Sequence, residues 1–555
     1  MPDNTFTQRS PVFADLLLER ADDDHPGLLF EDSRWTWHQV VRECFARATV
    51  LTQLCRYGRM FHVGVLLENE PEYIFLLGAA SLCGATVVGI NPTRRGRELA
   101  ADIRGADCDL IVTDSARAAM LAEIDTGVDG ERIFIADSAA WTELVAAARH
   151  NRMIATAAQD PATRLLLTFT SGSTAAPKAV ICSTGRLAAL AMANPFGITR
   201  DDVTYNSMPL FHGNAIMACW APSVFTGATF TMRRKFSVSG FLPDIRRFGA
   251  TYFNYVGRSL AYLLTAPESP LEADTRLRIV FGTEATPRDR AEFERRFGVR
   301  PVESYGSSEG VISIRLTPDS PPNSLGRPPE FLDIEIHDEF GRQCPRARFD
   351  SHGRLLNPGA AIGEIVNVAG AHLFEGYYNN PEADRDRLHC NVFRSGDLGY
   401  RDEAGFFYFA GRSGDRIRVD GENFSTAPVE RILARFPGLA HVAVYPVADE
   451  RTGDQVMAAL ELVDDARFDA EAFGVFLCGQ GDLGTKWAPR YVRIIHRMPV
   501  TATRKVDKPA LRRAAWLVHD PIYIRRGKSF HYHRASEADK AEIIAQFAKY
   551  GRSPC

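Results

Sequence analysis

Hydroxyl, glycine and lysine residues gather in a short run after an apolar segment, residues 165–169. The run reads Thr170-Ser171-Gly172-Ser173-Thr174-Ala175-Ala176-Pro177-Lys178. Backbone N–H groups in a glycine-containing turn, together with hydroxyls, form a concavity that binds anions without steric bulk. Lys178 adds a positive point charge. The run is not a Walker loop, because Pro177 stands where the second glycine would precede the lysine. We therefore predict that it binds a polyphosphate.

A second short motif, Gly306-Ser307-Ser308-Glu309-Gly310, matches the G-x-S-x-G nucleophile elbow of serine hydrolases. That elbow requires a helix directly after its serine. Residues 311–315 are rich in β-branched side chains and strand-like instead, and no H-G-G-G-type oxyanion segment precedes the motif. These features argue against a hydrolase.

Six motifs follow the phosphate loop in a recognisable order. They are residues 208–213 (MPLFHG), 305–309 (YGSSE), 363–365 (GEI), 394–398 (RSGDL), 411–415 (GRSGD) and 501–505 (TATRK). Together with the loop, they resemble the motifs of the adenylate-forming superfamily, which includes acyl-CoA synthetases, peptide-synthetase adenylation domains and luciferases. The resemblance covers nearly the whole chain.

Within that superfamily the chain is most similar to the branch of fatty acid transport proteins and very-long-chain acyl-CoA synthetases. The similarity rests on residues 412–415 (RSGD), residues 421–426 (GENFST) and a tail that begins Asp520-Pro521-Ile522-Tyr523. Membrane-bound members of the branch carry an N-terminal anchor. We find no such anchor in this sequence and do not expect transport across a membrane.

The resemblance implies a two-step reaction that requires ATP, Mg²⁺ and coenzyme A. A carboxylate attacks the α-phosphate of ATP and gives acyl-adenylate and pyrophosphate; the thiol of coenzyme A then attacks the activated carbonyl. Neither step needs an enzyme nucleophile, so the protein must bring anions together and stabilise the charge on phosphate. The expected acid is a long- or very-long-chain fatty acid. A steroid side-chain acid, and a carrier-protein thiol as acceptor, are the alternatives.

Lys505 is the lysine implied for adenylation, because in the resembling family this side chain reaches the carboxylate and the α-phosphate together. Arg504 replaces the usual glycine, and Lys508 lies only three residues further on. The position relative to Pro499 and Thr501 favours Lys505.

Two further residues carry implied catalytic roles. Glu309, with Thr170, is expected to hold Mg²⁺, which prefers carboxylate and other oxygen ligands. His212 belongs to the implied acyl pocket, where it either gates the substrate carboxylate or packs. Asn214 and Glu284 are polar where a fatty-acid tunnel would be apolar, which keeps the steroid alternative open.

The remaining implied contacts are with the nucleotide and coenzyme A. Tyr305 offers a flat face for adenine, Ser308 a hydroxyl for the α-phosphate, and Asp397 and Arg412 hydrogen bonds for the ribose. The residues expected to bind ATP or coenzyme A are Thr170, Ser171, Gly172, Ser173, Thr174, Lys178, Gly282, Thr283, Ser304, Tyr305, Gly306, Ser308, Asp397, Arg412, Gly421, Glu422 and Asn423.

Apolar runs alternate with helix-like stretches over the first three hundred residues, which indicates parallel sheets covered by helices. Residues 73–90 are uncharged and reach the length of a membrane span. Their glycine and alanine content favours a buried helix followed by a strand at residues 86–90. The strand-like runs are residues 62–67, 109–112, 132–135, 165–169, 251–255 and 278–281, and residues 288–297 are helix-like.

The pattern changes after the proline-rich residues 317–329, where alternating strands and turns indicate a β-rich subdomain. A chain of 555 residues is too long for one hydrophobic core. We predict an α/β fold. Its N-terminal adenylation domain, residues 1–413, has two parallel-type helix-covered sheets and the β-rich subdomain. A small mobile α+β domain, residues 414–555, carries Lys505 and rotates about Gly414, which stands at the implied hinge position.

Composition limits the remaining function classes. The 65 basic and 69 acidic residues give a net charge of −4, which argues against a nucleic-acid binder. The ten cysteines are scattered and show no C-x-x-C spacing, so we expect neither a disulfide framework nor a zinc site. We also find no signal peptide at Met1 and expect a cytoplasmic protein. Peripheral membrane contact and a homodimer are left open.

Overall fold

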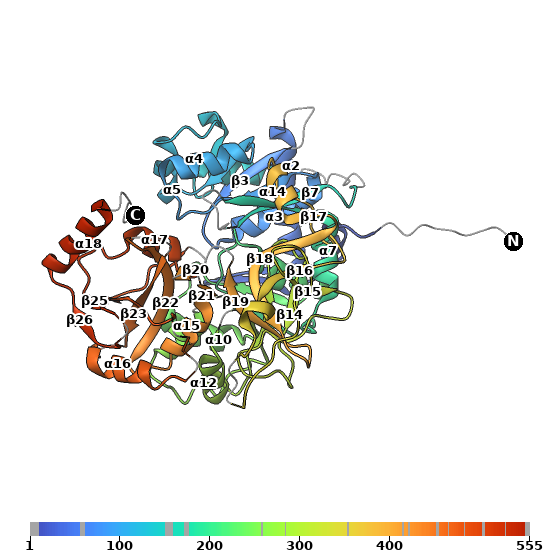
Figure 1. Cartoon of the computed structure of the whole chain (residues 1–555). Helices are drawn as coiled ribbons and strands as arrows, with labels where there is room; N and C mark the ends of the chain where they lie inside the picture. The colour runs from blue at the N-terminus through green and yellow to red at the C-terminus, as the bar shows by residue number, and fades with distance from the viewer. Residues whose placement is uncertain are drawn as a thin grey trace. The chain divides into compact units, whose positions relative to one another are not determined.

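The computed structural model describes residues 10–55, 61–149, 159–170, 177–256, 259–283, 285–351, 355–412, 416–419, 422–450, 454–463, 466–481, 483–484, 486–501, 505–527 and 529–549. The chain divides into two compact units (Figure 1). The first unit comprises Met1–Arg315 and Ala369–Val392, and the second comprises Leu316–Val368 and Phe393–Cys555. The predicted boundary between residues 413 and 414 falls outside the described residues and stays a prediction, as does the hinge at Gly414.

A six-stranded sheet carries the predicted phosphate loop. Its order is β6-β5-β3-β4-β7-β8, and every neighbouring pair is parallel except β7 and β8. Strands β3 to β5 are buried along their whole length, as expected for a parallel sheet covered on both faces. The strands are β3 (His62–Leu66), β4 (Thr86–Gly89), β5 (Leu110–Thr113), β6 (Ile133–Ile135), β7 (Arg164–Thr170) and β8 (Lys178–Ser183).

Helices α2 and α3 carry local sequence signals at their ends. Thr36 and Gln39 form a capping box at the start of α2. The next helix, α3, has Pro71 at its first position and ends at Gly84, whose φ is +75°. Within α3, all residues from Tyr73 to Leu82 are buried, which confirms the interpretation as a buried helix. No helix among the described residues is long and apolar enough to cross a membrane. The helices of this sheet are α2 (Trp37–Leu54), α3 (Pro71–Cys83), α4 (Gly96–Gly105), α5 (Ser115–Ala122), η1 (Gly130–Arg132) and α6 (Ala139–Ala148).

An eight-stranded sheet forms the second layer of the first unit. Its order is β14-β13-β12-β11-β9-β10-β1-β2, parallel in the middle and antiparallel at both edges. An aromatic core including Phe253, Tyr255 and Phe293 joins this sheet to helices α10 and α12. The strands are β1 (Pro26–Phe30), β2 (Ser33–Thr36), β9 (Val203–Asn206), β10 (Thr229–Met232), β11 (Tyr252–Val256), β12 (Ile279–Thr283), β13 (Val302–Gly306) and β14 (Ser313–Arg315). The other elements of the first unit are α1 (Phe13–Leu18), α7 (Thr184–Ala193), α8 (Gly213–Ala215), the π-helix η2 (Ile216–Trp220), α9 (Ala221–Thr226), α10 (Val238–Phe248), α11 (Ser259–Leu264), α12 (Pro287–Phe297), α14 (Pro381–Arg387) and β17 (Leu388–His389).

Asp202 ties the start of β9 to β11 through a buried carboxylate. Thr251 Oγ1 donates a hydrogen bond to it at 2.6 Å, the Thr199 N–H donates at 2.7 Å, and Arg278 forms an ion pair with it. Burial opposes ionisation of Asp202, but hydrogen bonds from Arg278, Thr251 and Thr199 outweigh it and lower the pKa of the carboxyl to about 2.

The low pKa predicts a pH-dependent stability. Because the folded pKa lies below the unfolded one, the carboxylate stabilises the fold above pH ~4, and this stabilisation is lost as the pH falls toward 2. Asp202→Asn should therefore lower the free energy of unfolding by about 2 kcal/mol at pH 7 and by about half of that near pH 3. Denaturant unfolding of both proteins across this range measures the difference. A difference in the free energy of unfolding that stays constant with pH would contradict the low pKa of Asp202.

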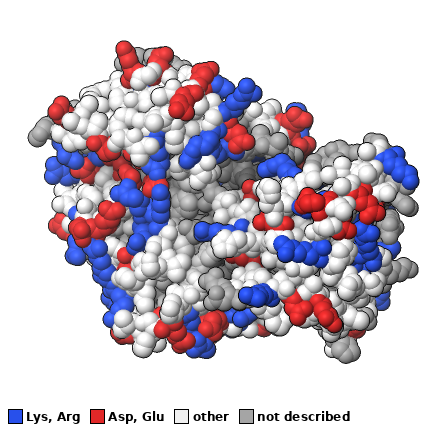
Figure 2. All heavy atoms as spheres, turned by 90° about the vertical axis from the view of Figure 1, so that its left-hand side faces the viewer, with Lys and Arg blue, Asp and Glu red and all other residues white. Residues whose placement is uncertain are grey.

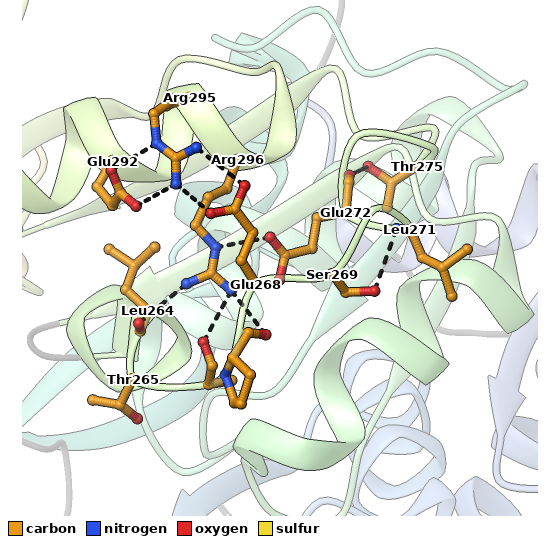
Figure 3. A network of polar contacts seen from close by, with 12 residues as sticks. Leu264, Thr265, Glu268, Ser269, Leu271, Glu272, Thr275, Glu292, Arg295 and Arg296 are labelled. Carbon is orange, nitrogen blue, oxygen red and sulfur yellow. Dashed lines mark hydrogen bonds and ion pairs between the residues drawn. The ribbon is translucent and has the colours of Figure 1, made fainter.

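A buried ion pair fixes the segment before β12 onto α12 (Figure 3). Arg296 and Glu272 are 4% and 5% exposed at their side chains and approach to 2.5 Å. Arg296 also donates to the carbonyl oxygens of Leu264 at 3.1 Å and Ala266 at 3.2 Å. The Arg296 guanidinium, at the end of α12, therefore donates to a carboxylate and to two backbone carbonyls.

Removing the carboxylate of this ion pair should lower the free energy of unfolding. Glu272→Ala leaves Arg296 buried without its carboxylate and should destabilise the protein by about 3–5 kcal/mol. Glu268→Ala is the matched control, because Glu268 pairs with the exposed Arg295 in the same network (Figure 3). Thermal unfolding should show a clearly lower midpoint for Glu272→Ala and little change for Glu268→Ala. Equal midpoints would contradict the role of the buried pair.

The second unit contains an antiparallel sheet and a mixed C-terminal part. Strand β16 pairs with β15 and β18, and β19 pairs with β18. The C-terminal sheet runs β22-β23-β24-β25-β26, with only β23 and β24 parallel. Its elements are β15 (Ile334–His337), α13 (Pro358–Ala361), β16 (Gly363–Asn367), β18 (Val392–Arg401), β19 (Phe407–Arg412), β20 (Arg416–Val419), β21 (Glu422–Ser425), α15 (Thr426–Leu433), β22 (Leu439–Ala448), β23 (Asp454–Leu462), α16 (Ala470–Cys478), β24 (Tyr491–Ile495), α17 (Lys508–Ala514), β25 (Ile522–Arg525), β26 (Tyr532–Arg534) and α18 (Glu537–Lys549). The predicted α/β class, with two helix-covered sheets, a β-rich part and a small C-terminal part, is confirmed.

Charge is distributed over the described surface in small groups of both signs. Figure 2 shows Lys and Arg side chains interspersed with Asp and Glu on the face that it presents. This distribution agrees with the small net charge of −4.

Candidate active site

The two ends of the predicted phosphate loop meet in a hairpin. Strands β7 and β8 are antiparallel, and Thr170 lies opposite Lys178 in their register. Thr170 Oγ1 donates a hydrogen bond to the Lys178 carbonyl at 3.4 Å. The predicted residues Ser171, Gly172, Ser173 and Thr174 lie outside the described residues. Thr170 and Lys178, which begin and end the predicted loop, therefore lie side by side on neighbouring strands.

Glu309 and Lys178 meet on opposite parts of one tyrosine side chain. The hydroxyl of Tyr377 donates a hydrogen bond to Glu309 Oε1 at 2.6 Å, and Lys178 Nζ lies 5.2 Å from the centre of the Tyr377 ring. Burial and the neighbouring Glu309 carboxylate raise the pKa of the Tyr377 hydroxyl, so it remains a neutral donor. The structure thus brings the predicted magnesium ligand next to the predicted phosphate-binding lysine.

The backbone explains how Tyr377 reaches this place. The Ile181 N–H donates to the Gly376 carbonyl at 3.1 Å, and the Tyr378 N–H donates to the Ala179 carbonyl at 2.8 Å. The segment around Tyr377 thereby adds to the edge of β8. No spacing in the sequence connects Tyr377 with the loop, because the two segments are about two hundred residues apart.

A buried arginine holds the turn that carries Glu309. Arg186, at the start of α7, donates to the Ser308 carbonyl at 2.6 Å and to the Ile181 carbonyl at 2.7 Å. Gly310 has φ +72°, and a Cβ there would lie 2.8 Å from the Arg186 guanidinium. The turn is therefore fixed by a charged donor on one side and by a glycine-only conformation on the other.

The nucleophile-elbow alternative fails at this turn. Ser308 follows β13, but the chain continues into β14 and not into a helix. Strand β14 pairs antiparallel with β13. The geometry that exposes a hydrolase serine between a strand and a helix is therefore absent from this described part of the chain.

The other predicted nucleotide contacts of the first unit lie on neighbouring strands. Gly282 and Thr283 end β12, and Ser304, Tyr305 and Gly306 end β13. The two strands are parallel and hydrogen-bonded. Their carboxyl ends therefore open on the same edge of the sheet, which is the usual place for ligands in parallel sheets.

Two residues that the resemblance assigns to the acyl pocket, His212 and Asn214, lie beside a buried amide. His212 caps α8, its Nδ1 accepting a hydrogen bond from the Asn214 N–H at 3.3 Å. Asn254 Nδ2 donates to Asn214 Oδ1 at 2.8 Å. Asn254 is fully buried, and its own Oδ1 has no hydrogen-bond partner among the described residues. A Cβ on Gly213 would lie 3.6 Å from Ser308 Oγ, so this pocket borders the predicted phosphate contact.

The two predicted ribose contacts are neighbours in the second unit. Asp397 on β18 lies directly opposite Arg412 on β19 in the antiparallel register. The Asp397 N–H donates to Ser395 Oγ at 3.0 Å, which fixes the backbone at that position. The structure brings these two positions together as the resemblance implies.

Lys505 closes a short turn, whereas Lys508 is held by a helix. The Lys505 N–H donates to Thr501 Oγ1 at 3.2 Å, and the Thr501 N–H donates to the Lys505 carbonyl at 2.7 Å. Lys508 Nζ lies 2.9 Å from both Thr426 Oγ1 and Glu430 Oε1 of α15. The catalytic role of Lys505 stays a prediction.

The predicted coenzyme A contacts belong to the β20–β21 hairpin. Glu422 and Asn423 lie in β21, opposite Val419 and Arg418 of β20. Gly421 lies outside the described residues. The roles of these residues stay predictions.

The chemistry of the first unit's side chains fits a magnesium-bound triphosphate. Glu309 is buried, with 6% of its surface exposed, and no described Lys or Arg forms an ion pair with it. A buried carboxylate with one neutral donor is costly unless a cation compensates its charge. Mg²⁺ binds through one or two carboxylates together with phosphate oxygens and water, and Lys178 supplies charge for the phosphates.

Comparison with known proteins places the chain in a family. The model of the AMP-binding enzyme family matches residues 18–378. A steroid-22-oyl-CoA synthetase of Rhodococcus jostii is 52% identical over 548 residues, 98% of both chains. A medium/long-chain-fatty-acid–CoA ligase of Mycobacterium tuberculosis is 44% identical over 524 residues, covering 94% of this chain and 100% of that one. The ATP-bound structure of MatB from Rhodopseudomonas palustris has a TM-score of 0.78 at 22% identity, covering 91% of this chain and 99% of that one. The chain belongs to the AMP-binding enzyme family.

Proposed function

We propose that this AMP-forming acid–thiol ligase activates a steroid side-chain carboxylic acid with ATP and transfers the acyl group to coenzyme A. The observation that carries the ATP-dependent step is the buried Glu309 carboxylate beside Tyr377 and Lys178. It is a charge that lacks a cationic partner among the described residues, placed next to a lysine at the end of a glycine-containing loop. A magnesium nucleotide supplies the missing cation.

Each step balances without an enzyme nucleophile. An oxygen of the substrate carboxylate forms a bond to the α-phosphorus, the bond to the β-phosphate oxygen breaks, and pyrophosphate leaves. The sulfur of coenzyme A then bonds to the acyl carbon, AMP leaves, and the thiol proton passes to solvent. Mg²⁺ neutralises phosphate charge when bound, and Glu309 with Thr170 would hold it.

The chain's own residues bind and orient the reactants. Lys178 attracts the pyrophosphate end, and Lys505 donates to the carboxylate and the α-phosphate. Asp397, opposite Arg412, accepts from the ribose hydroxyls. Because the family's lysine acts from a small mobile domain, we propose that rotation about Gly414 brings Lys505 to the first step and residues 421–423 to the second.

The choice of a steroid acid rests on the buried amide pair. Asn254 Oδ1 is a buried acceptor with no donor among the described residues, and leaving such an acceptor unpaired beside a plain hydrocarbon chain costs about 1–3 kcal/mol. A ring hydroxyl on the substrate would satisfy it. The 52% identical relative is named a steroid-22-oyl-CoA synthetase, which supports the same class of acid. A medium- or long-chain fatty acid is the second candidate, supported by the relatives at 44% identity.

Thioester formation tests this choice. Purified protein is incubated with ATP, Mg²⁺, coenzyme A and equal concentrations of steroid side-chain, medium-, long- and very-long-chain acids, and the acyl-CoA product is quantified by mass spectrometry. We expect the highest kcat/KM with a steroid acid. A higher kcat/KM with every fatty acid would reverse the order of the two candidates. In a parallel incubation with a carrier protein added, product on the carrier thiol but not on coenzyme A would exclude coenzyme A as the acceptor.

A further inference from the structure

Glu303 is a buried carboxylate that no predicted role accounts for. It lies on β13 directly before Ser304 and is 8% exposed. Three donors from three other segments converge on it. The Tyr255 hydroxyl of β11 donates at 3.0 Å, the Ala285 N–H donates at 2.5 Å, and Arg290 Nη1 of α12 donates at 2.5 Å.

The contacts of Glu303 connect it to residues before and after the end of β12 at Thr283. Ala285 is bound through its backbone N–H, and Gly282 packs directly beneath the Tyr255 ring. A Cβ at Gly282 would lie 2.4 Å from that ring. Glu303 and Tyr255 together therefore fix residue 282 and residue 285 against β13.

This arrangement positions residues that the nucleotide is expected to contact. Gly282 and Thr283 are the last two residues of β12, and Tyr305 is two residues after Glu303 on β13. Side chains two residues apart in a strand point to the same face. A shift of about 1 Å in such a segment is enough to lower a rate about 10²-fold.

Burial by itself disfavours a charged carboxylate at position 303. Burial raises the pKa of the Glu303 carboxyl, and Arg290 opposes this change only in part. Replacing a buried ion pair with apolar side chains of similar volume is often neutral or stabilising. An apolar side chain here could not accept the Ala285 N–H, so the backbone contact is what distinguishes glutamate at this position.

We propose that Glu303 is a positioning residue for ATP binding, because it holds Ala285 directly, and Gly282 through Tyr255, against the strand that carries Tyr305. This proposal rests on the proposed ATP-dependent function. It predicts that Glu303 acts on nucleotide affinity through the backbone of Ala285, without touching the nucleotide.

Calorimetric titration of the full-length protein with MgATP, in the absence of acid, tests the proposal. Glu303→Ala should weaken MgATP binding about 10-fold or more, because the Ala285 N–H loses its acceptor on β13. Glu303→Gln keeps an acceptor for the Ala285 N–H and should stay within about threefold of the natural protein. Glu303→Asp keeps the charge but is one methylene shorter, and should weaken binding severalfold.

Glu272→Ala is the matched control. It removes the carboxylate of another buried Arg–Glu pair, whose arginine lies on the same helix α12, and that carboxylate binds Arg296 and not Ala285. We expect it to lower thermal stability without changing MgATP affinity more than about twofold. Equal weakening by Glu272→Ala and Glu303→Ala, or a folded Glu303→Asp with unchanged affinity, would overturn the proposal. Failure of the natural protein to bind MgATP would instead contradict the proposed function.

Discussion

Lys505→Ala is expected to lower the rate of acyl-adenylate formation by a factor of about 10²–10³. The reason is the loss of a preorganised cationic donor at the point where negative charge develops between two anions. The expected loss corresponds to about 3–4 kcal/mol of transition-state stabilisation. Single-turnover measurement of adenylate at saturating ATP and acid isolates this step from thioester formation.

Lys508→Ala provides the matched control for Lys505. Lys508 forms a hydrogen bond with Thr426 and an ion pair with Glu430 of α15. Lys508→Ala should therefore lower the free energy of unfolding and have little effect on the rate of adenylate formation. Lys505 closes its turn through its backbone N–H and carbonyl, and truncating the side chain leaves both of these groups in place. If Lys508→Ala abolished adenylation while Lys505→Ala did not, the two roles would have to be exchanged.

Glu309→Gln should lower kcat/KM for ATP about 10²-fold and raise the Mg²⁺ concentration needed for half-maximal rate. Replacing an outer partner of a metal ligand already costs about 10–100-fold, and Glu309 is proposed as the ligand itself. The substitution keeps the size of the side chain and an acceptor for the Tyr377 hydroxyl. A magnesium titration of the initial rate measures both effects.

Tyr377→Phe tests how much the orientation of Glu309 contributes, because it removes the hydrogen bond to Glu309 and keeps the Glu309 charge. The phenylalanine keeps an aromatic ring beneath Lys178 but loses the hydrogen bond to Glu309. We expect about a 10-fold loss in activity, smaller than that of Glu309→Gln. Unfolding without nucleotide gives an independent check. Glu309→Gln removes a buried charge, so stability should stay the same or rise, whereas a purely structural glutamate would make it fall.

Local sequence patterns were sufficient to predict the strands that consist of continuous apolar runs. The apolar runs at residues 62–67, 109–112 and 165–169 became β3, β5 and β7, because strands buried on both faces need continuous apolar residues. The sequence did not predict the pairing of β1 with β10, since Leu28 and Phe230 are about two hundred residues apart. Strand β9 was also missed, because Val203-Thr204-Tyr205-Asn206 is too polar for the buried-strand pattern.

The residues of the candidate site also fall into those that local sequence motifs predicted and those that they did not. Thr170, Lys178 and Glu309 belong to contiguous motifs, and the structure brings Lys178 and Glu309 to the same tyrosine. Tyr377 and Arg186 were not predicted. Arg186 donates a hydrogen bond to the backbone carbonyl of Ser308. Every residue type has such a carbonyl, so no sequence pattern indicates this contact.

The most direct test of ATP-dependent acid activation is exchange of labelled pyrophosphate into ATP. This exchange requires reversible adenylate formation and needs no coenzyme A. We predict exchange that depends on a steroid side-chain acid and on Mg²⁺, and that is strongly reduced in Lys505→Ala. A folded protein that shows no exchange with any steroid or fatty acid would contradict the account.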